Sequence, residues 1–244
     1  MRLAVIGQNI DYSLSPKIHH YWMEHYSLQG TYDLVDTDEE NLQQILGQYQ
    51  GGNVTTPYKK KVIPLMDCLT PLARLVGAVN TIYLSDDKWI GDNTDCLALT
   101  EMVKNFPQAN KAMILGSGGA AKAALVALQD LAIESATCSR TQTTEAWVPW
   151  AERHRRIQEV NVIINATPLG LNGQGGPLDF LPSHPCLVVD MVYQPRCTSL
   201  IKLALEHQHM ACDGLEVLVR QARHSFSRWW GILPDYEPVW RFLQ

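Results

Sequence analysis

The 244-residue sequence lacks the features that mark several classes of protein. Its net charge is −5, so it has no basic surplus for binding nucleic acid or an anionic membrane. No apolar run approaches the roughly 20 residues of a membrane span, and the apolar segment Leu3–Gly7 is too short for a signal peptide. Six cysteines are present, without a C-x-x-C pair or a histidine at metal-ligand spacing. We therefore expect a cytoplasmic protein with reduced thiols and no metal site.

Internal repeats, low-complexity tracts and a long Pro/Gly/Ser linker are absent as well. With 46% hydrophobic residues, a chain of this length can bury one large core or two smaller ones. Strand and helix patterns occur throughout. The expectation is an α/β protein of two lobes, an N-terminal α/β lobe from residues 1–98 plus 222–244 and a Rossmann-like, doubly wound parallel-sheet lobe from residues 99–221.

A glycine-rich turn organises the second lobe. Ala112–Leu115 is a short apolar run that predicts a strand, and Lys122–Leu131 predicts a helix. Between them Gly116–Ala121 reads G-S-G-G-A-A, the G-x-G-x-x-A form of the dinucleotide fingerprint. The glycines allow a tight turn and a close approach of the backbone to a pyrophosphate, whose charge the helix N-terminus favours. The pattern predicts a dinucleotide site.

The residues after the next predicted strand, Ser135–Cys138, indicate which dinucleotide. An NAD site favours Asp or Glu there for the ribose 2′-hydroxyl, whereas an NADP site favours Arg with small hydroxyl residues. This chain has Ser139-Arg140-Thr141, and its Glu145 falls in what we interpret as the next helix. Arg140 can bind a phosphate with its forked guanidinium or stack on adenine. NADP is therefore favoured over NAD.

Helix starts and hairpins follow from local signals. Ser15 is predicted to be an N-cap followed by Pro16 in the first helical position, and Thr94 is predicted to cap another helix. A T-x-x-E pattern at Thr37–Glu40 predicts a capping box. Further strands are expected at Arg2–Ile6, Thr31–Val35, Gly52–Thr55, Val79–Leu84, Trp89–Gly91, Val160–Asn165 and Cys186–Asp190, and helices at Ser199–Gln208, Gly214–Trp230 and Glu237–Leu243.

Four polar clusters in the first lobe are candidates for chemistry: Ser13–Pro16, Asn53–Lys59, Val76–Thr81 and Gly91–Asp95. Each also has a structural interpretation. Ser15 would be needed as a cap, and Lys59 could be one of three solvated lysines with Lys60 and Lys61.

Taken together, these clusters resemble the shikimate dehydrogenase family almost end to end. The resemblance rests on S-x-S-P at Ser13–Pro16, N-V-T-x-P-x-K at Asn53–Lys59, G-A-V-N-T at Gly77–Thr81 and G-D-N-T-D at Gly91–Asp95. It continues with the glycine turn, N-A-T-P-x-G at Asn165–Gly170, Asp190–Tyr193, Asp213–Leu215 and Gln221.

The resemblance implies NADP(H)-dependent, reversible reduction of 3-dehydroshikimate to shikimate, a step in aromatic amino acid biosynthesis, by a monomer or homodimer. Lys59 and Asp95 would form the catalytic pair. Ser13 and Ser15 would bind the substrate carboxylate, with Thr55, Asn80, Asp95, Gln221 and Tyr193 around the ring. The cofactor would contact Gly116, Ser117, Gly118, Gly119, Ala120, Ser139, Arg140, Thr141, Thr167, Met191 and Gly214.

Several positions depart from the family pattern. Cys96 and Glu216 stand where glycine is common, Ser139 replaces Asn, and Thr144 occupies the place of a second basic residue. Arg140 would then be the main phosphate partner. The alternatives are a quinate/shikimate dehydrogenase using NAD or NADP, a paralogue that senses a ligand without turnover, and a methylenetetrahydrofolate dehydrogenase. The paired serines argue against quinate, which carries an additional hydroxyl beside its carboxylate.

Overall fold

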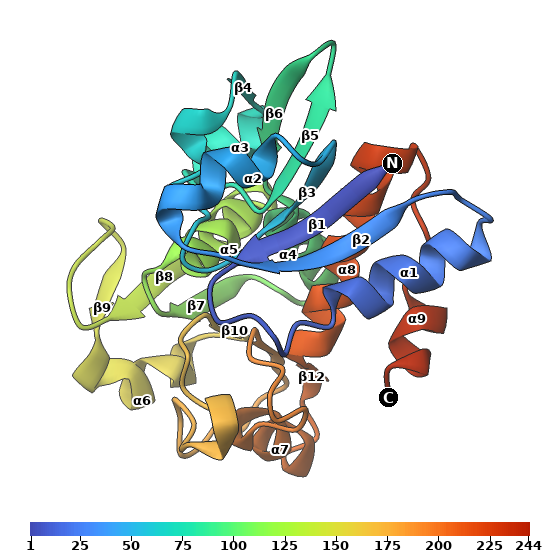
Figure 1. Ribbon diagram of the computed structural model, residues 1–244. Coiled ribbons are helices and arrows are strands. Elements are labelled where there is room, and N and C mark those ends of the chain that lie inside the picture. Colours follow the sequence, from blue (N-terminus) through green and yellow to red (C-terminus); the bar gives the residue numbers. More distant parts are fainter. The chain divides into compact units, whose positions relative to one another are not determined.

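The computed structural model describes residues 1–244. The chain divides into two compact units, Met1–Thr94 with Leu218–Gln244, and Asp95–Val217 (Figure 1). Each unit holds a six-stranded sheet. The expected fold class, two-lobed α/β with a doubly wound second lobe, is confirmed.

The sheet of the first unit is mixed, with strand order β2-β1-β3-β5-β6-β4. Strand β1 pairs in parallel with β2 and β3, whereas β5 is antiparallel to β3 and β6. The β5–β6 hairpin turns at Asp86 and Asp87, whose φ values of 50° and 59° suit a tight primed turn. The strands are β1 Arg2–Gly7, β2 Thr31–Asp36, β3 Gly51–Val54, β4 Cys68–Leu69, β5 Thr81–Ser85 and β6 Lys88–Asp92.

Helices complete this unit: α1 Ser15–His25, α2 Leu42–Leu46, α3 Pro71–Val76 and α9 Glu237–Phe242, with short 3-10 turns at Glu39–Asn41 and Ile63–Leu65. Residues 218–230 of α8 (Gly214–Trp230) belong here too. The Trp229 indole N–H donates to the Ile82 carbonyl at 3.0 Å, and the Arg228 guanidinium binds the fully buried Asp92 at 2.7 Å. These contacts fix α8 on β5 and β6.

The predicted capping box at Thr37–Glu40 is wrong. The turn there is a 3-10 helix, its N-cap is Asp38, and no side chain caps it. The Thr37 hydroxyl donates to the Asp38 carbonyl at 3.3 Å, so it does not serve the following amides.

The sheet of the second unit is parallel throughout, with order β12-β11-β10-β7-β8-β9. Its strands are β7 Lys111–Leu115, β8 Glu134–Ser139, β9 Trp147–Pro149, β10 Val162–Asn165, β11 Leu187–Asp190 and β12 Met210–Cys212. After β9 the chain returns to the centre, and β10 pairs with β7. Ligands of such sheets bind beyond the carboxyl ends of the strands at this reversal.

The helices of this unit are α5 Gly119–Asp130, α6 Arg153–Arg156 and α7 Ser199–Glu206, and α4 Thr94–Lys104 begins at its boundary. Helix α5 packs on β7 and β8, and α7 packs on β11 and β12. The interpretation of Glu145 as helical is wrong, because this residue precedes the short strand β9. Strands β9 and β12 were not anticipated.

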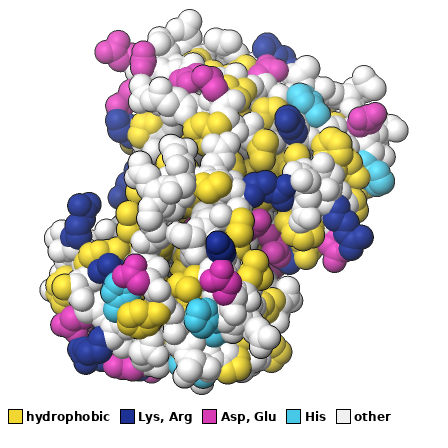
Figure 2. All heavy atoms as spheres, turned by 90° about the horizontal axis from the view of Figure 1, so that it is seen from below, with side chains coloured by type: hydrophobic (Ala, Val, Ile, Leu, Met, Phe, Trp, Pro, Cys, Tyr) yellow, Lys and Arg dark blue, Asp and Glu magenta, His cyan; other side chains and the backbone are white.

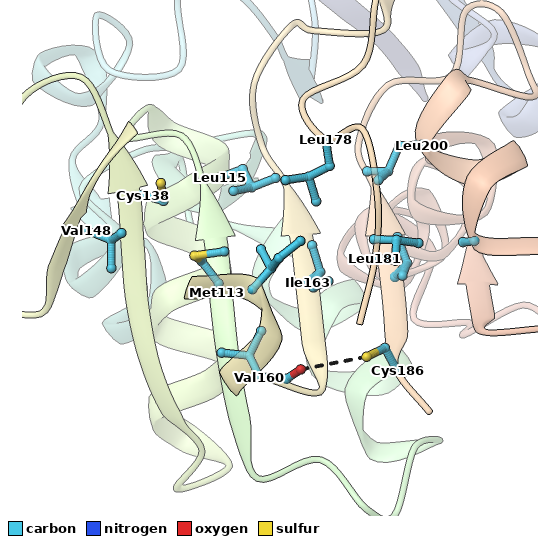
Figure 3. Packing of buried hydrophobic residues seen from close by; sticks show 13 residues of the cluster. Met113, Leu115, Cys138, Val148, Val160, Ile163, Leu178, Leu181, Cys186 and Leu200 are labelled. Atoms are coloured by element: carbon cyan, nitrogen blue, oxygen red, sulfur yellow. Dashed lines mark hydrogen bonds between the residues drawn. The ribbon is translucent and has the colours of Figure 1, made fainter. Parts of the chain in front are cut away.

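A buried apolar cluster fills one side of the second sheet (Figure 3). It includes two thiols, Cys138 and Cys186, whose pKa values burial raises to about 11. The Cys186 thiol donates weakly to the Val160 carbonyl at 3.7 Å. Both thiols are therefore protonated at neutral pH and pack as small apolar groups.

Surface charges of both signs are interspersed on the face drawn in Figure 2, without a continuous basic patch. None of the helices has the length and hydropathy needed to cross a bilayer.

Candidate active site

The turn before α1 carries the paired serines. The prediction that Ser15 is the N-cap is wrong: the N-cap is Leu14, and Ser15 is the first helical residue. The Ser13 hydroxyl accepts the Ser15 amide N–H at 3.3 Å, so Ser13 satisfies one amide at this helix end. Ser15 is 4% exposed, and its hydrogen bond with Tyr32 opposes the rise that burial causes in the Tyr32 pKa. The Ser15 hydroxyl therefore bonds to Tyr32 rather than capping the helix.

Lys59 differs from the two lysines that follow it. Its side chain is half-buried, whereas Lys60 and Lys61 are exposed, and Lys61 pairs with Glu39. The Lys59 carbonyl accepts the Val79 amide at 2.7 Å, which ties this loop to the segment leading into β5. Lys59 is therefore not one of three equivalent solvated lysines. Thr55, at the start of the same loop, is half-buried and donates its amide to Ile6 at 2.9 Å.

Asn80 and Gln221 meet in a buried polar cluster, although 141 residues separate them in the chain. The Asn80 amide N–H donates to Gln221 Oε1 at 3.3 Å, and the Gln221 amide donates to the Leu218 carbonyl at 2.8 Å. Asn80 Oδ1 accepts the Thr94 backbone N–H at 2.7 Å. Each primary amide carries two N–H groups, and these bonds use one from each. Each amide therefore has a second N–H that these two bonds do not use.

Buried hydroxyl groups of Ser225 and Thr81 link the members of this cluster by hydrogen bonds. The Ser225 hydroxyl lies 2.7 Å from Thr81 Oγ1 and 3.1 Å from Thr94 Oγ1. Ser225, Thr81 and Thr94 are each 0% exposed. Thr94, predicted as a helix cap, is the first residue of α4, and its hydroxyl belongs to this network. The cluster fixes the amides before any ligand arrives.

Sequence reasoning missed Asn53 as an organising residue, although it opens the N-V-T-x-P-x-K motif. Its amide donates to Ser225 Oγ at 2.9 Å and to the Asn80 carbonyl at 3.1 Å, and its oxygen accepts the Tyr32 hydroxyl at 2.6 Å. A signal for the network existed in α8, because Gln221 and Ser225 are four residues apart and share one helix face.

Asp95 occupies the first turn of α4 and is 6% exposed. A carboxylate at this position is favoured by the helix dipole. Cys96 beside it is 2% exposed and packs in the interior. Tyr193 is half-buried in the segment after β11. Glu216 is half-buried in the first turn of α8, where its amide donates to Asp213 at 2.8 Å.

The glycine turn after β7 opens a cavity of about 600 Å³ in the second unit. Gly116 has φ of +119°, and a Cβ there would lie 2.9 Å from the Ala166 carbonyl oxygen, so glycine is required. A Cβ on Gly118 would meet nothing within 4 Å, so space for a ligand lies above the backbone. Gly119 and Ala120 begin α5, one turn earlier than expected, and Ser117 is exposed. The free N–H groups of a 12-residue helix suit a pyrophosphate.

The far end of this cavity is lined by Ser139, Arg140 and Thr141. Arg140 and Thr141 are exposed, whereas Ser139 is 5% exposed. The Ser139 hydroxyl donates to the Thr141 carbonyl at 2.6 Å and accepts the Trp147 indole N–H at 3.1 Å. The Ser139 hydroxyl therefore stabilises the turn. Arg140 is the positively charged side chain that lines the cavity.

The segment after β10 forms the opposite wall. Asn165 Oδ1 accepts both the hydroxyl and the amide of Thr167, at 2.6 and 3.1 Å, and its amide donates to Asp190 at 2.9 Å. The Thr167 hydroxyl also accepts the Leu169 amide at 3.2 Å. Thr167 therefore lines the cavity with its remaining surface while its hydroxyl fixes the loop.

Met191 and Gly214 lie against each other in the second unit. A Cβ on Gly214 would be 2.8 Å from the Met191 carbonyl oxygen and 2.5 Å from that of Val192. The start of α8 therefore passes directly over the segment after β11, which only glycine permits. These two residues are not among those lining the 600 Å³ cavity.

The sheet order, the glycine turn and the cavity beyond the strand ends place the second unit in the class of Rossmann-like, doubly wound domains. Comparison with known proteins identifies the family. Residues 5–82 match the model described as the shikimate dehydrogenase substrate binding domain. Shikimate dehydrogenase (NADP(+)) of Cereibacter sphaeroides is 33% identical over 260 residues, which are 96% of this chain and 93% of that protein.

Solved structures agree. Shikimate 5-dehydrogenase of Thermus thermophilus, in complex with NADP(H) and shikimate, superposes with a TM-score of 0.88 at 30% identity over 99% of this chain and 97% of that one. Quinate dehydrogenase of Corynebacterium glutamicum, in complex with NAD, gives a TM-score of 0.89 at 26% identity over 100% and 98%. The chain belongs to the shikimate dehydrogenase family.

Proposed function

We propose that this chain is an NADP-dependent oxidoreductase that interconverts shikimate and 3-dehydroshikimate. Its relatives of that name match nearly the whole chain. In this proposal most substrate contacts come from the unit formed by residues 1–94 and 218–244, and the dinucleotide contacts come from the unit formed by residues 95–217.

The observation that carries the substrate assignment is the fixed pair of amides, Asn80 and Gln221. A polyhydroxylated ring needs several hydrogen-bond donors and acceptors at set positions. The buried cluster already holds both amides in place, so a ligand does not have to order them on binding. Ser13 and Ser15 bind the carboxylate, and Thr55 and Tyr193 complete the set of ring contacts.

The catalytic pair in this proposal is Lys59 and Asp95. When the carbonyl is reduced, negative charge develops on its oxygen, which a positioned ammonium stabilises and then protonates. Lys59 has this role, and its half-buried side chain favours a single orientation over solvation. The Asp95 carboxylate binds a substrate hydroxyl and so orients the ring.

The residues of the 600 Å³ cavity fit NADP. Open space above Gly118 and the N-terminus of α5 suit the pyrophosphate, and Arg140 suits the 2′-phosphate. The bound cofactor supplies the hydride. Six free cysteines are in keeping with a cytoplasmic enzyme. We propose a monomer or homodimer on the resemblance to the family alone.

Lys59→Ala tests the catalytic assignment, with Lys60→Ala as the matched control. Lys59 donates the proton in the reduction and takes it from the hydroxyl in the oxidation, so its loss should lower kcat for shikimate oxidation at least ~100-fold, while circular dichroism shows an unchanged fold. Removing the neighbouring exposed lysine should change kcat less than about twofold. Near-normal turnover in Lys59→Ala, or equal losses in both variants, would remove Lys59 from the mechanism.

A further inference from the structure

The cofactor cavity has one aromatic wall, Trp150, that no sequence motif indicated. Trp150 follows β9 directly, and Arg140 follows β8 directly. The register of these parallel strands pairs Ser139 with Pro149, so Arg140 and Trp150 leave neighbouring strand ends at the same edge. Adjacent strands lie about 4.8 Å apart, which brings the guanidinium and the indole to the same end of the cavity.

Arg153 fixes the orientation of the indole. Its guanidinium carbon lies 4.7 Å from the centroid of the Trp150 ring and covers one face. Arg153 Nε donates to the Pro177 carbonyl at 2.8 Å, and one terminal nitrogen donates to the Trp150 carbonyl at 3.1 Å. Trp150 also packs on the buried apolar cluster of the second sheet, and part of its surface lines the cavity.

Two of the hydroxyl side chains that line the cavity are committed within the protein. The hydroxyls of Ser139 and Thr167 are used within the protein. Thr144, which stands in place of a second basic residue, lies 2.7 Å from the Thr137 hydroxyl and donates to the Ala146 carbonyl at 2.9 Å. Arg140 is the charged side chain and Trp150 the aromatic side chain that line this cavity, which suits them to the adenosine end of a dinucleotide.

We propose that Trp150 is the adenine platform of this cavity, with the purine stacked on the part of the indole that lines it and Arg140 left for the 2′-phosphate. The proposal rests on the assignment of the cavity to NADP. It divides the two parts of recognition: Trp150 contributes affinity common to NADP and NAD, and Arg140 contributes the preference for the phosphorylated form.

Calorimetric titration with NADP⁺ and NAD⁺ tests this division without relying on turnover. Stacking of a base on an aromatic side chain contributes roughly 1–3 kcal/mol, so Trp150→Ala should weaken both ligands by a similar factor of about 5 to 150. Trp150→Phe retains an aromatic face and should stay within about threefold of the original protein. Arg140→Ala should weaken NADP⁺ far more than NAD⁺.

Fluorescence separates stacking from a purely structural role. NADP⁺ should quench indole emission in the original protein, and the part of the quench due to Trp150 should vanish in Trp150→Phe, although the calorimetric Kd is retained. Unchanged affinity of Trp150→Ala for both ligands, or an unaltered quench in Trp150→Phe, would overturn the proposal.

The outcomes also distinguish this proposal from the proposed function. Shikimate turnover with NADP⁺ together with normal cofactor binding by Trp150→Ala would leave the function standing and remove the platform. Cofactor binding that depends on Trp150, without turnover of shikimate, would do the reverse. A protein that binds neither dinucleotide would overturn both.

Discussion

Removal of the Ser225 hydroxyl should destabilise the first unit and disturb the amides that we assign to the substrate. This hydroxyl lies 2.7 Å from Thr81 Oγ1, 2.9 Å from Asn53 Nδ2 and 3.1 Å from Thr94 Oγ1. Ser225→Ala deletes these three bonds, and a longer one to the Gln221 carbonyl at 3.3 Å, in a site with no access to solvent.

The magnitude follows from what each partner retains. A buried hydrogen bond contributes about 1 kcal/mol net, and a partner left unpaired costs more. Asn53 keeps its bond to the Asn80 carbonyl, and the threonine hydroxyls keep Asn80 Oδ1. No partner is orphaned, so the loss should be about 2 kcal/mol rather than the 3 to 9 kcal/mol of three unsatisfied groups.

Urea unfolding followed by tryptophan fluorescence measures this loss as a lower midpoint at an unchanged m value. Ser227→Ala is the matched control, because Ser227 is on the same helix, is only half-buried and should lose less than about 0.5 kcal/mol. The KM for shikimate should rise in Ser225→Ala and not in the control. Equal stability of the two variants would refute the view that this network organises the site.

Two further perturbations test the packing of each unit. Burial lowers the pKa of His19 from about 6.5 to about 3, so between these pH values the unfolded chain binds more protons than the folded protein. The free energy of unfolding therefore falls as the pH drops through that window, by up to about 1.4 kcal/mol per pH unit. His19→Phe should reduce this slope between pH 6 and 4, and an unaltered slope would contradict the explanation. Gly214→Ala places a Cβ 2.5 Å from the Val192 backbone and should lower the free energy of unfolding by more than about 2 kcal/mol. Gly175→Ala is the control, because its Cβ would meet nothing within 4 Å and should change stability little. Similar thermal midpoints for the two variants would show that glycine is not required at position 214.

Long, strongly patterned elements were predictable. The helix Gly214–Trp230 was expected with its observed bounds, because its apolar stripe is continuous from Leu215 to Phe226. The three-residue strands β9 and β12 were not, since so short a segment shows no periodicity and forms only through its neighbour in the sheet. Missing β9 also concealed Trp150 as a wall of the cofactor cavity.

Polar residues showed a different limit. Ser13 and Ser15 are both residue types that can cap a helix. Which of them bonds to an amide at the helix end depends on the conformation of the turn, which residue type alone does not specify. Asn53 bonds with partners up to 172 residues away in the chain, so no local pattern could assign its role. The local sequence indicated which side chains can form hydrogen bonds. The tertiary fold determined which of these groups are already bonded within the protein.

Oxidation of shikimate by the purified protein, with NADP⁺ and NAD⁺ compared and quinate measured beside it, tests the central claim most directly. The account predicts rapid turnover of shikimate with NADP⁺, a much lower kcat/KM with NAD⁺, and little activity on quinate. Saturable NADP⁺ binding without turnover of either acid would contradict it and indicate a relative that binds its ligands without catalysis.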